Sequence, residues 1–326
     1  MQIVTHRRPI KQFVEDFSGK EITIIGPTGV GDVFWVYQKF APYFDKINFD
    51  LMWTRGNRPQ LPDEEPTVME MRAIDWIKCL PKVHEVKMKY LFQDIVIDTC
   101  HQYPQMADII NAWKNNEEIF YCLNEWLNDG IRLEDIDPGS KLEWNIPVPS
   151  EPFELPCDEY ALFFVGGTCH DTNGITVSHM KNLFHMWNVD VFVDLLIKVY
   201  NKYSKSWPVF VIGGSHERHL YDYISRLFAI KGIATYPMYC KNPKQVTYLM
   251  KNTKFFLHYQ CGLSVWADNL NIPQIAIFLA PNLNANGTVK NVAAINAWRK
   301  NNDELFCATH FDCPPDQIVE NLKLRI

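Results

Sequence analysis

Apolar segments that run into glycine-rich turns recur along the second half of this sequence. In three places such a segment ends near glycine and a helical pattern follows: YALFFVGGT (160–168), WPVFVIGGSHER (207–218) and KFFLHYQCGLSVWADNLNIPQIAIF (254–278). The last of these returns to a strand pattern after its helix. Strands that alternate with helices in this way form parallel sheets covered by helices on both faces. The pattern therefore predicts an α/β fold.

The first half of the chain shows the same alternation of strand and helix signals, read from apolar spacing and helix formers. We expect strands at 22–25, 46–54 and 94–100, and helices at 33–44, 67–81 and 106–127. In the second half we expect helices at 189–203, from about 218 to 229, at 243–252 and at 315–324.

A segment rich in proline and acidic residues separates the two halves. DIDPGSKLEWNIPVPSEPFELPCDE has no apolar periodicity, which is typical of a linker and places the domain boundary near 140–157. We therefore expect two Rossmann-like domains, residues 1–150 and 151–326, whose parallel sheets face each other across a cleft. The last helix is expected to pack back on the N-terminal domain.

The stretch IIGPTGVGDVFWV (24–36) has the glycine spacing of a phosphate-binding P-loop but lacks its two functional side chains. Asp32 and Val33 stand where the pattern requires Lys and Ser or Thr, so neither phosphate neutralisation nor magnesium binding is provided. The glycines also lack the order of a dinucleotide fingerprint. Asp32 is then either a first-turn acid that complements the helix dipole or a functional carboxylate at the sheet edge.

Composition excludes several classes of protein. The chain has 326 residues, 47% of them hydrophobic, and it has no apolar run of the roughly 18 residues that span a bilayer. The start of the chain has no signal-peptide pattern, and the nine cysteines lack paired metal-ligand spacing, which favours reduced thiols, a cytoplasmic location and no metal site. The net charge of −6 disfavours, without excluding, DNA as a partner.

The turn Cys261-Gly262-Leu263-Ser264 lies between a predicted strand and a predicted helix. Helix N-termini expose N–H groups and a partial positive charge, so they hold anions without Lys or Arg. The Ser264 hydroxyl is a further donor. This turn is a candidate site for a phosphate or diphosphate, although glycine at such a turn also serves the backbone alone.

Five motifs of this chain together resemble the glycosyltransferases that include the bacterial lipopolysaccharide heptosyltransferases (glycosyltransferase family 9). They are GVGDVFWVYQKFAPYF, ALFFVGGT, WPVFVIGGSHER, FFLHYQCGLSVWADNLNIPQIAIF and PPDQIVENL, in the family's order over about residues 21–322. The resemblance implies a GT-B architecture in which the N-terminal domain holds the acceptor and the C-terminal domain holds a nucleotide-diphosphate sugar. It implies no metal and no other cofactor, because helix dipoles and backbone amides carry the leaving diphosphate.

From this resemblance and the residues we predict a cytoplasmic, inverting glycosyltransferase that uses Asp32 as general base toward a saccharide or other hydroxyl acceptor. Whether the sugar is a hexosyl, heptosyl or pentosyl group stays open. Gly29 and Gly31 are assigned to the acceptor loop. The predicted donor and phosphate ligands are Gly166, Gly167, Thr168, Lys181, Gly213, Gly214, Gln260, Cys261, Gly262, Leu263 and Ser264.

Two positions depart from the family pattern, with Gln260 in place of its acid and Val265 in place of its histidine. The resemblance therefore supports the reaction class and not an ADP-heptose donor. A glycosyltransferase that acts on a modified DNA base, a sugar-nucleotide epimerase of the same architecture and a non-enzymatic nucleotide-sugar binding module remain as alternatives. His170, His216 and His258 receive no role.

Overall fold

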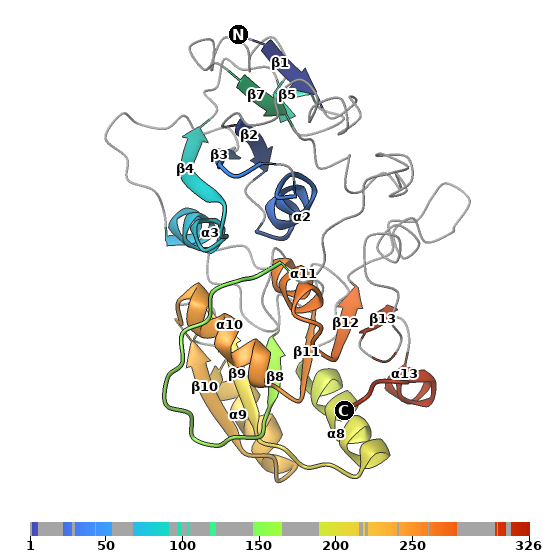
Figure 1. The fold of residues 1–326 in the computed structure, drawn as a ribbon. Coiled ribbons are helices and arrows are strands. Elements are labelled where there is room, and N and C mark those ends of the chain that lie inside the picture. Colours follow the sequence, from blue (N-terminus) through green and yellow to red (C-terminus); the bar gives the residue numbers. More distant parts are fainter. Residues whose placement is uncertain are drawn as a thin grey trace, which may run out of the picture. The chain divides into compact units, whose positions relative to one another are not determined.

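The structure is a computed structural model, and it divides into two compact units, Met1–Val148 and Pro149–Ile326 (Figure 1). We describe each unit by itself. The residues that the structure describes are 2–5, 22–27, 30–42, 44–53, 68–90, 97–98, 103–104, 118–121, 146–164, 189–214, 218, 221–239, 241–259, 261–278, 304, 306–310 and 314–326.

The N-terminal unit contains a five-stranded, fully parallel sheet of order β1-β7-β2-β3-β4. The central strand β2 pairs with β3 on one side and with β7 on the other, so the strand order reverses between β2 and β7. The strands are β1 (Gln2–Thr5), β2 (Ile22–Pro27), β3 (Ile47–Trp53), β4 (Val83–Tyr90) and β7 (Glu118–Tyr121). The described helices are α2 (Val30–Phe40) and α3 (Val68–Lys78), and β5 (Ile97–Asp98) pairs antiparallel with β6 (Tyr103–Pro104).

The predictions for this half are confirmed for β2, β3, α2 and α3. The expected strand 94–100 is confirmed over Ile97–Asp98, and its other residues lie outside the described ones. The expected helix at 106–127 is wrong where it contains β7. The strands β1 and β4 were not expected. β7 has hydrogen-bonded neighbours on both sides, β1 and β2, so pairing with distant segments overrides the local preference for helix.

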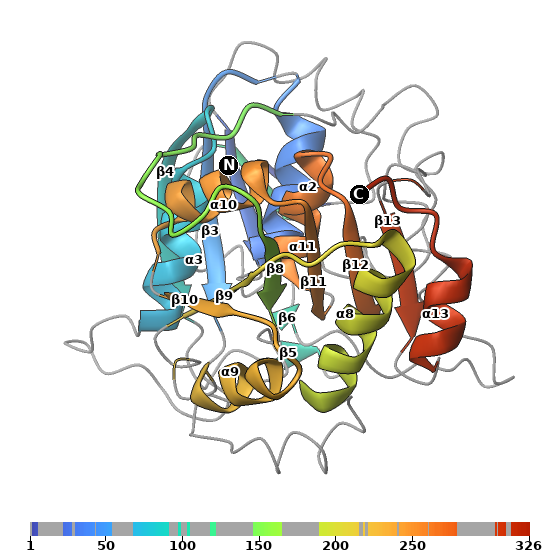
Figure 2. The same cartoon turned by 90° about the horizontal axis from the view of Figure 1, so that it is seen from below.

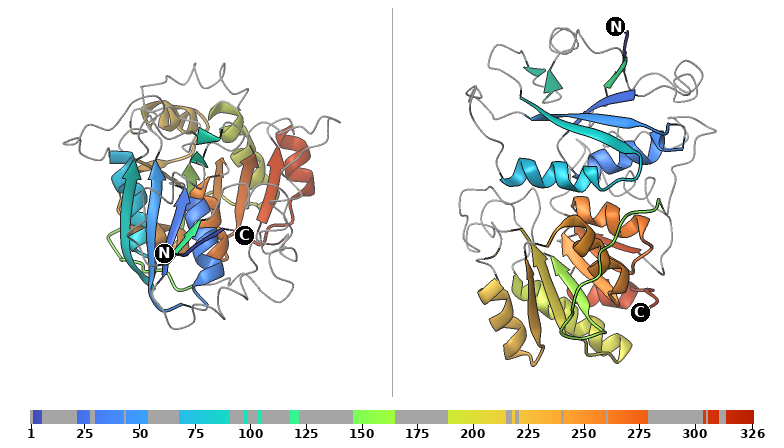
Figure 3. Two further views of the ribbon diagram at one scale, coloured as in Figure 1. Left: turned by 90° about the horizontal axis from the view of Figure 1, so that it is seen from above. Right: turned by 60° about the vertical axis from the view of Figure 1, so that its left-hand side comes forward.

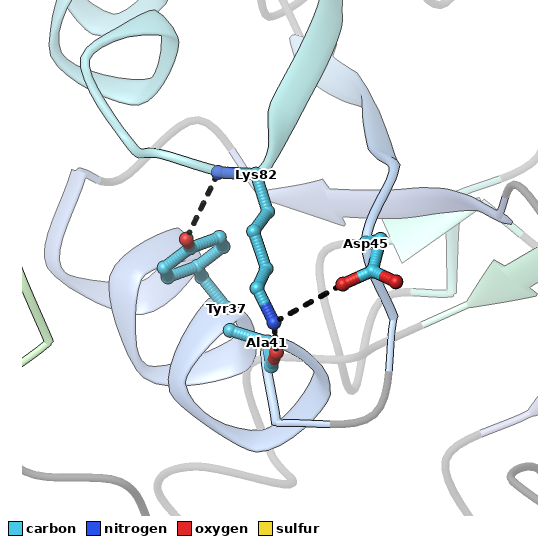
Figure 4. A network of polar contacts seen from close by, with 4 residues as sticks. All are labelled: Tyr37, Ala41, Asp45 and Lys82. Carbon is cyan, nitrogen blue, oxygen red and sulfur yellow. Dashed lines mark hydrogen bonds and ion pairs between the residues drawn. The ribbon is translucent and has the colours of Figure 1, made fainter.

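The C-terminal end of α2 is held by Lys82, which lies just before β4 (Figure 4). The Lys82 ammonium donates to the Ala41 carbonyl oxygen at 2.5 Å and lies 3.7 Å from the Asp45 carboxylate, while the Lys82 backbone N–H donates to the Tyr37 hydroxyl at 3.3 Å. A cation at this end of a helix satisfies a carbonyl left over by the helix and complements the helix dipole. Helix α2 is thereby tied to the sheet at its end, and its first turn follows β2.

The C-terminal unit contains a six-stranded parallel sheet of order β10-β9-β8-β11-β12-β13. Counted along the chain, this is the order 3-2-1-4-5-6 of doubly wound α/β sheets. Strands β8, β9, β11 and β12 were predicted, and β10 and β13 were not. The strands are β8 (Ala161–Phe164), β9 (Val209–Gly213), β10 (Thr235–Tyr239), β11 (Phe255–Tyr259), β12 (Gln274–Phe278) and β13 (Phe306–His310).

Helices cover both faces of this sheet, with α8 and α9 on one side and α10 and α11 on the other (Figure 2). On the first face, Phe163 packs edge-to-face against Phe192 and Phe228, at 5.5 and 5.4 Å between ring centroids. On the other face, Tyr160 stacks on Phe210 at 4.0 Å and its hydroxyl donates to the Leu249 carbonyl. The helices are α8 (Val189–Tyr203), α9 (Tyr221–Ile230), α10 (Pro243–Asn252), α11 (Gly262–Asn269) and α13 (Pro315–Asn321).

Helix α13 packs against α8, next to the edge strand β13 (Figure 3). Ile318 is buried in the core of this unit, and Lys198 of α8 forms an ion pair with Asp316 at 2.5 Å. The Lys202 ammonium donates to carbonyls at the C-terminal end of α13, those of Val319 and Glu320, and to that of Leu322, which caps the helix. The apolar side of α13 is thus buried against α8 within its own unit, and the expected packing of this helix on the N-terminal domain stays a prediction.

The proline-rich segment predicted as a linker is anchored on α10. The Glu151 backbone N–H donates to the Lys244 carbonyl at 3.1 Å, and the Lys241 ammonium lies 4.6 Å from the centre of the Phe153 ring. Phe153 also contacts Tyr248, with ring centroids 5.8 Å apart. This segment therefore leads the chain along α10 before it enters β8.

Candidate functional site

The strand order of the C-terminal unit reverses between β8 and β11. The two strands are paired in register from Phe255 opposite Ala161 to His258 opposite Phe164. From β8 the chain continues to β9 on one side, and from β11 it continues to β12 on the other. Open α/β sheets bind ligands outside the carboxyl ends of their strands at such a reversal. This edge of the sheet is the candidate site.

Two of the glycine-rich segments singled out from the sequence are described at this edge, and a third follows the neighbouring strand β8 in the sequence. Gly213 ends β9, and Gly214 follows it, both partly exposed. The segment with Gly166, Gly167 and Thr168 follows β8, and the turn from Cys261 to Ser264 follows β11. Because β9, β8 and β11 are adjacent and parallel, their carboxyl ends lie side by side. The strand pairing thus places the ends of β9, β8 and β11 next to one another, although they are distant in sequence.

The first turn of α11 is closed by hydrogen bonds between Cys261 and Ser264. The Cys261 N–H donates to the Ser264 hydroxyl oxygen at 3.1 Å, and the Ser264 hydroxyl donates to the Cys261 carbonyl oxygen. The Ser264 N–H also donates to that carbonyl, at 3.0 Å. Ser264 is fully buried, so its hydroxyl caps the helix where the sequence analysis expected a donor to phosphate. The first residues of α11 after this cap, Gly262 and Leu263, offer main-chain donors.

Helix α11 is fixed to α10 by a chain of buried hydrogen bonds. The Trp266 indole N–H donates to the Thr247 hydroxyl at 3.0 Å, and that hydroxyl donates to the Pro243 carbonyl at 2.8 Å. Trp266 and Thr247 are both fully buried. Trp266 is therefore part of the core, and the helix start is held in one orientation relative to the sheet.

A buried polar pair that the sequence analysis gave no role lies at the end of β11. His258 Nε2 is 3.0 Å from Gln274 Oε1, and His258 Nδ1 is 2.7 Å from the carbonyl oxygen of Tyr259. Both side chains are fully buried. A lone histidine in an apolar strand gives no sequence signal of this kind, because its partner comes from the next strand.

The N-terminal unit has the same arrangement at its own reversal, between β2 and β7. Strand β2 runs into α2, whose first three residues are Val30, Gly31 and Asp32. Gly31 is buried, and Asp32 belongs to the first turn of the helix. The backbone of Asp32 is therefore near the carboxyl edge of the sheet, the place where α/β folds put functional groups. The side chain of Asp32 lies outside the described part of the structure.

Five of the predicted site residues of the C-terminal unit and one of the acceptor loop lie outside the described residues. They are Gly166, Gly167, Thr168, Lys181, Gln260 and Gly29. Among the residues that are described, no group of three or more His, Cys, Asp or Glu side chains has the arrangement of a metal site. No helix within the described ranges has the length and apolar character needed to cross a membrane.

Neither a protein-family model nor a curated protein sequence matches this chain. Solved structures do resemble it. They include E. coli ADP-heptose lipopolysaccharide heptosyltransferase II (11% identity, TM-score 0.49, covering 93% of this chain and 97% of that one). A family 9 glycosyltransferase from Veillonella parvula has 9% identity and a TM-score of 0.44 over 90% of this chain and 86% of its own. E. coli heptosyltransferase WaaC with ADP has 10% identity and a TM-score of 0.44 over 93% and 99%.

The structure of this chain thus resembles those of heptosyltransferases. They are proteins of the kind that the sequence motifs resemble. With identities near 10% and TM-scores below 0.5, it carries no argument about activity, donor or acceptor.

Proposed function

We propose that this protein is a glycosyltransferase that moves a sugar from a nucleotide-diphosphate sugar to an acceptor hydroxyl. The C-terminal unit is proposed to hold the donor and the N-terminal unit the acceptor, in two Rossmann-like domains that face each other across a cleft. The observation that carries this proposal is the β8–β11 reversal, because it brings the end of β9 at Gly213 and the first turn of α11 to the edge of a parallel sheet where β8 also ends. The five sequence motifs of glycosyltransferase family 9 support the same reaction.

The donor diphosphate is proposed to lie against the first turn of α11. A helix N-terminus carries a partial positive charge and unpaired N–H groups, so it stabilises negative charge that develops on a leaving diphosphate. The Cys261–Ser264 cap contributes no charge of its own. Gly262, the first residue of α11, has no Cβ that would hinder the approach of the ligand. Gly166, Gly167, Thr168, Gly213 and Gly214 are proposed to border the same ligand. With main-chain donors in this role, the reaction requires no metal.

Asp32 is proposed as the general base. Its carboxylate takes the proton from the acceptor hydroxyl while the hydroxyl oxygen forms a bond to the anomeric carbon of the sugar. The bond between that carbon and the diphosphate oxygen breaks, and its electrons leave with the nucleoside diphosphate. Attack from the face opposite the leaving group inverts the anomeric configuration. A positioned base of this kind contributes on the order of 10² to 10⁴ in rate.

A thermal-shift screen against nucleotide sugars tests the donor assignment. A ligand present at about 100 times its dissociation constant stabilises the folded state by about 2.7 kcal/mol, which raises the melting temperature by several degrees. We expect one nucleoside series among ADP-, UDP-, GDP- and CMP-sugars to give this shift. Incubating the active donor with candidate acceptors, and alone, then distinguishes transfer from epimerisation. The absence of a shift with every series at millimolar concentration would contradict the proposal.

A further inference from the structure

The side chain of His258 contacts the main chain at the point where β11 ends. Its Nδ1 lies 2.7 Å from the carbonyl oxygen of Tyr259, the last residue of the strand. A carbonyl oxygen only accepts hydrogen bonds, so Nδ1 carries the hydrogen and donates it. The ring also lies against Phe256, with centroids 4.1 Å apart, and is fully buried. The imidazole thus holds the Tyr259 carbonyl from within the core.

Gln274 holds the other side of the imidazole. It is the first residue of β12, and it pairs with Phe256, two residues before His258 on the same face of the sheet. Side chains in this diagonal relation are close enough to interact across neighbouring strands. The side-chain amide of Gln274 lies at hydrogen-bond distance from the ring, with 3.0 Å between His258 Nε2 and the amide atom placed as Oε1. Since Nδ1 carries the hydrogen, Nε2 accepts, and the donor is the Gln274 amide nitrogen with the amide turned over, which also gives that buried nitrogen a partner. The ring is therefore fixed in its plane from β12.

The pairing of β11 with β12 does not depend on these side chains. The two strands are joined by a parallel backbone ladder from Phe256 opposite Gln274 to Tyr259 opposite Ile277. What the imidazole adds is a restraint on one carbonyl, and the peptide plane of that carbonyl sets the direction in which the chain leaves the strand. Two residues later the chain reaches Cys261, the first member of the capped turn of α11.

We propose that His258 is a positioning residue for the donor site, acting through the Tyr259 carbonyl on the turn that holds the diphosphate. The inference rests on the proposed function, since the turn matters for catalysis only if a donor binds there. Gln274 serves the same purpose by fixing the plane of the ring. The direct contacts to the donor are made by the turn, and His258 sets its geometry.

Two substitutions at His258 separate this role from a general contribution to the core. Asparagine places its side-chain amide nitrogen near the position of Nδ1, so H258N keeps a donor for the Tyr259 carbonyl. Glutamine reaches the position of Nε2, so H258Q keeps the contact to Gln274 and loses the donor to the carbonyl. Both variants leave part of the ring volume empty, so a purely structural role predicts similar effects of the two.

Tyr160→Phe is the matched control. Its hydroxyl donates to the Leu249 carbonyl at 2.9 Å, and burial raises the pKa of Tyr160 far above its usual value, so the group is a neutral donor. The variant loses one buried hydrogen bond at the opposite, amino-terminal edge of the same sheet. Any effect of H258Q on the turn that exceeds the effect of Y160F is therefore specific to the carboxyl edge.

Calorimetric titration with ADP, UDP and GDP measures the consequence for binding. We expect H258Q to weaken binding of the preferred nucleoside diphosphate about tenfold, since one buried hydrogen bond is lost. The dissociation constants of H258N and Y160F are expected to stay within about threefold of that of the parent protein, a change smaller than the loss of one hydrogen bond produces. Equal losses of affinity in H258N and H258Q, or an unchanged affinity in H258Q, would overturn the positioning role.

Hydrogen exchange on the unliganded protein tests the same role independently of any nucleotide. Exchange in the peptide that contains Cys261 should be faster in H258Q than in H258N or Y160F, and ¹⁵N NMR of the imidazole should show hydrogen on Nδ1. If no nucleoside diphosphate binds the parent protein, the proposed function fails. The hydrogen-exchange and NMR measurements still decide whether His258 positions the turn. Unchanged exchange in H258Q, or an Nδ1 without hydrogen, would refute it.

Discussion

Helices α2 and α11 occupy equivalent places in the two units and begin with different chemistry. Each follows a parallel strand that borders the reversal of its sheet, β2 in one unit and β11 in the other. The first turn of α2 contains the acid Asp32, whereas that of α11 is closed by an uncharged cap between Cys261 and Ser264. A carboxylate in the first turn repels phosphate, and an uncharged cap leaves the dipole free to attract it. The comparison supports the proposal that proton transfer belongs to one helix start and anion binding to the other.

The largest effect is expected from removing the charge at the start of α2. Asp32→Asn should lower the transfer rate by about 10² to 10⁴ and leave donor binding unchanged, because the base acts only on the acceptor proton. Asp45→Asn is the matched control, since it makes the same change beyond the other end of α2, where the side chain is fully exposed. A near-normal rate in the Asp32 variant, measured with a donor that binds, would remove the mechanism.

Adding a carboxylate to the start of α11 should make it resemble α2. In Gly262→Asp, a negative charge about 5 Å from the diphosphate costs about 3 kcal/mol at an effective dielectric constant of 20, or roughly 100-fold in affinity. The asparagine side chain in Gly262→Asn has nearly the size of aspartate but no charge. This variant should therefore bind the diphosphate considerably more tightly than the Asp variant. Equal dissociation constants for the two variants, measured by calorimetry, would show that steric exclusion and not charge decides.

Removing the cap of α11 should have a moderate effect on stability. Ser264→Ala leaves the partly buried Cys261 N–H without its acceptor, and we expect a loss of about 1 to 2 kcal/mol in the free energy of unfolding. Ser225→Ala is the control, because that hydroxyl donates to the Asp222 carbonyl on an exposed helix surface, and its loss should change stability by less than about 0.5 kcal/mol. Urea unfolding of both variants gives the comparison, and equal midpoints would contradict the capping role.

The smallest effect is expected at the other end of α2. Lys82→Met removes the donor to the Ala41 carbonyl, and a partly exposed cation at a helix C-terminus contributes about 0.5 to 1 kcal/mol. Lys87→Met, which removes an exposed pair with Glu85, should cost less. Thermal unfolding in low and in high salt separates the two, because the bond to the carbonyl persists when exposed ion pairs are screened. If the two variants lose equal stability and both losses disappear in high salt, Lys82 acts as a surface charge only.

Local pattern predicted most elements of the C-terminal unit. Helix α8 was expected at 189–203 and has those bounds, because its apolar residues recur at helical spacing and one of its faces is buried. The short strand Glu118–Tyr121 was missed because four residues carry little periodicity and its partners, Gln2–Thr5 and β2, are distant in sequence. The starts of α2 and α11 were located from glycines at the ends of apolar strands.

The candidate site was only partly predictable, because some of its contacts join segments that are distant in sequence. The glycine-rich segments and the helix start at 262 follow from local sequence, because backbone freedom and capping act within a few residues. The inward direction of the Ser264 hydroxyl and the clamp of His258 by Gln274 do not, since they depend on burial and on strand register.

By itself, the amino-acid sequence determined where strands turn into helices and which of these turns carry glycine, serine or a carboxylate. Those features depend on backbone freedom and apolar spacing over short stretches of chain. Only the tertiary structure decided the strand order, the two reversals and therefore which turns meet at one edge of each sheet. Such pairings join segments tens of residues apart through backbone hydrogen bonds, which every residue except proline can form, and so leave no local signature in the sequence.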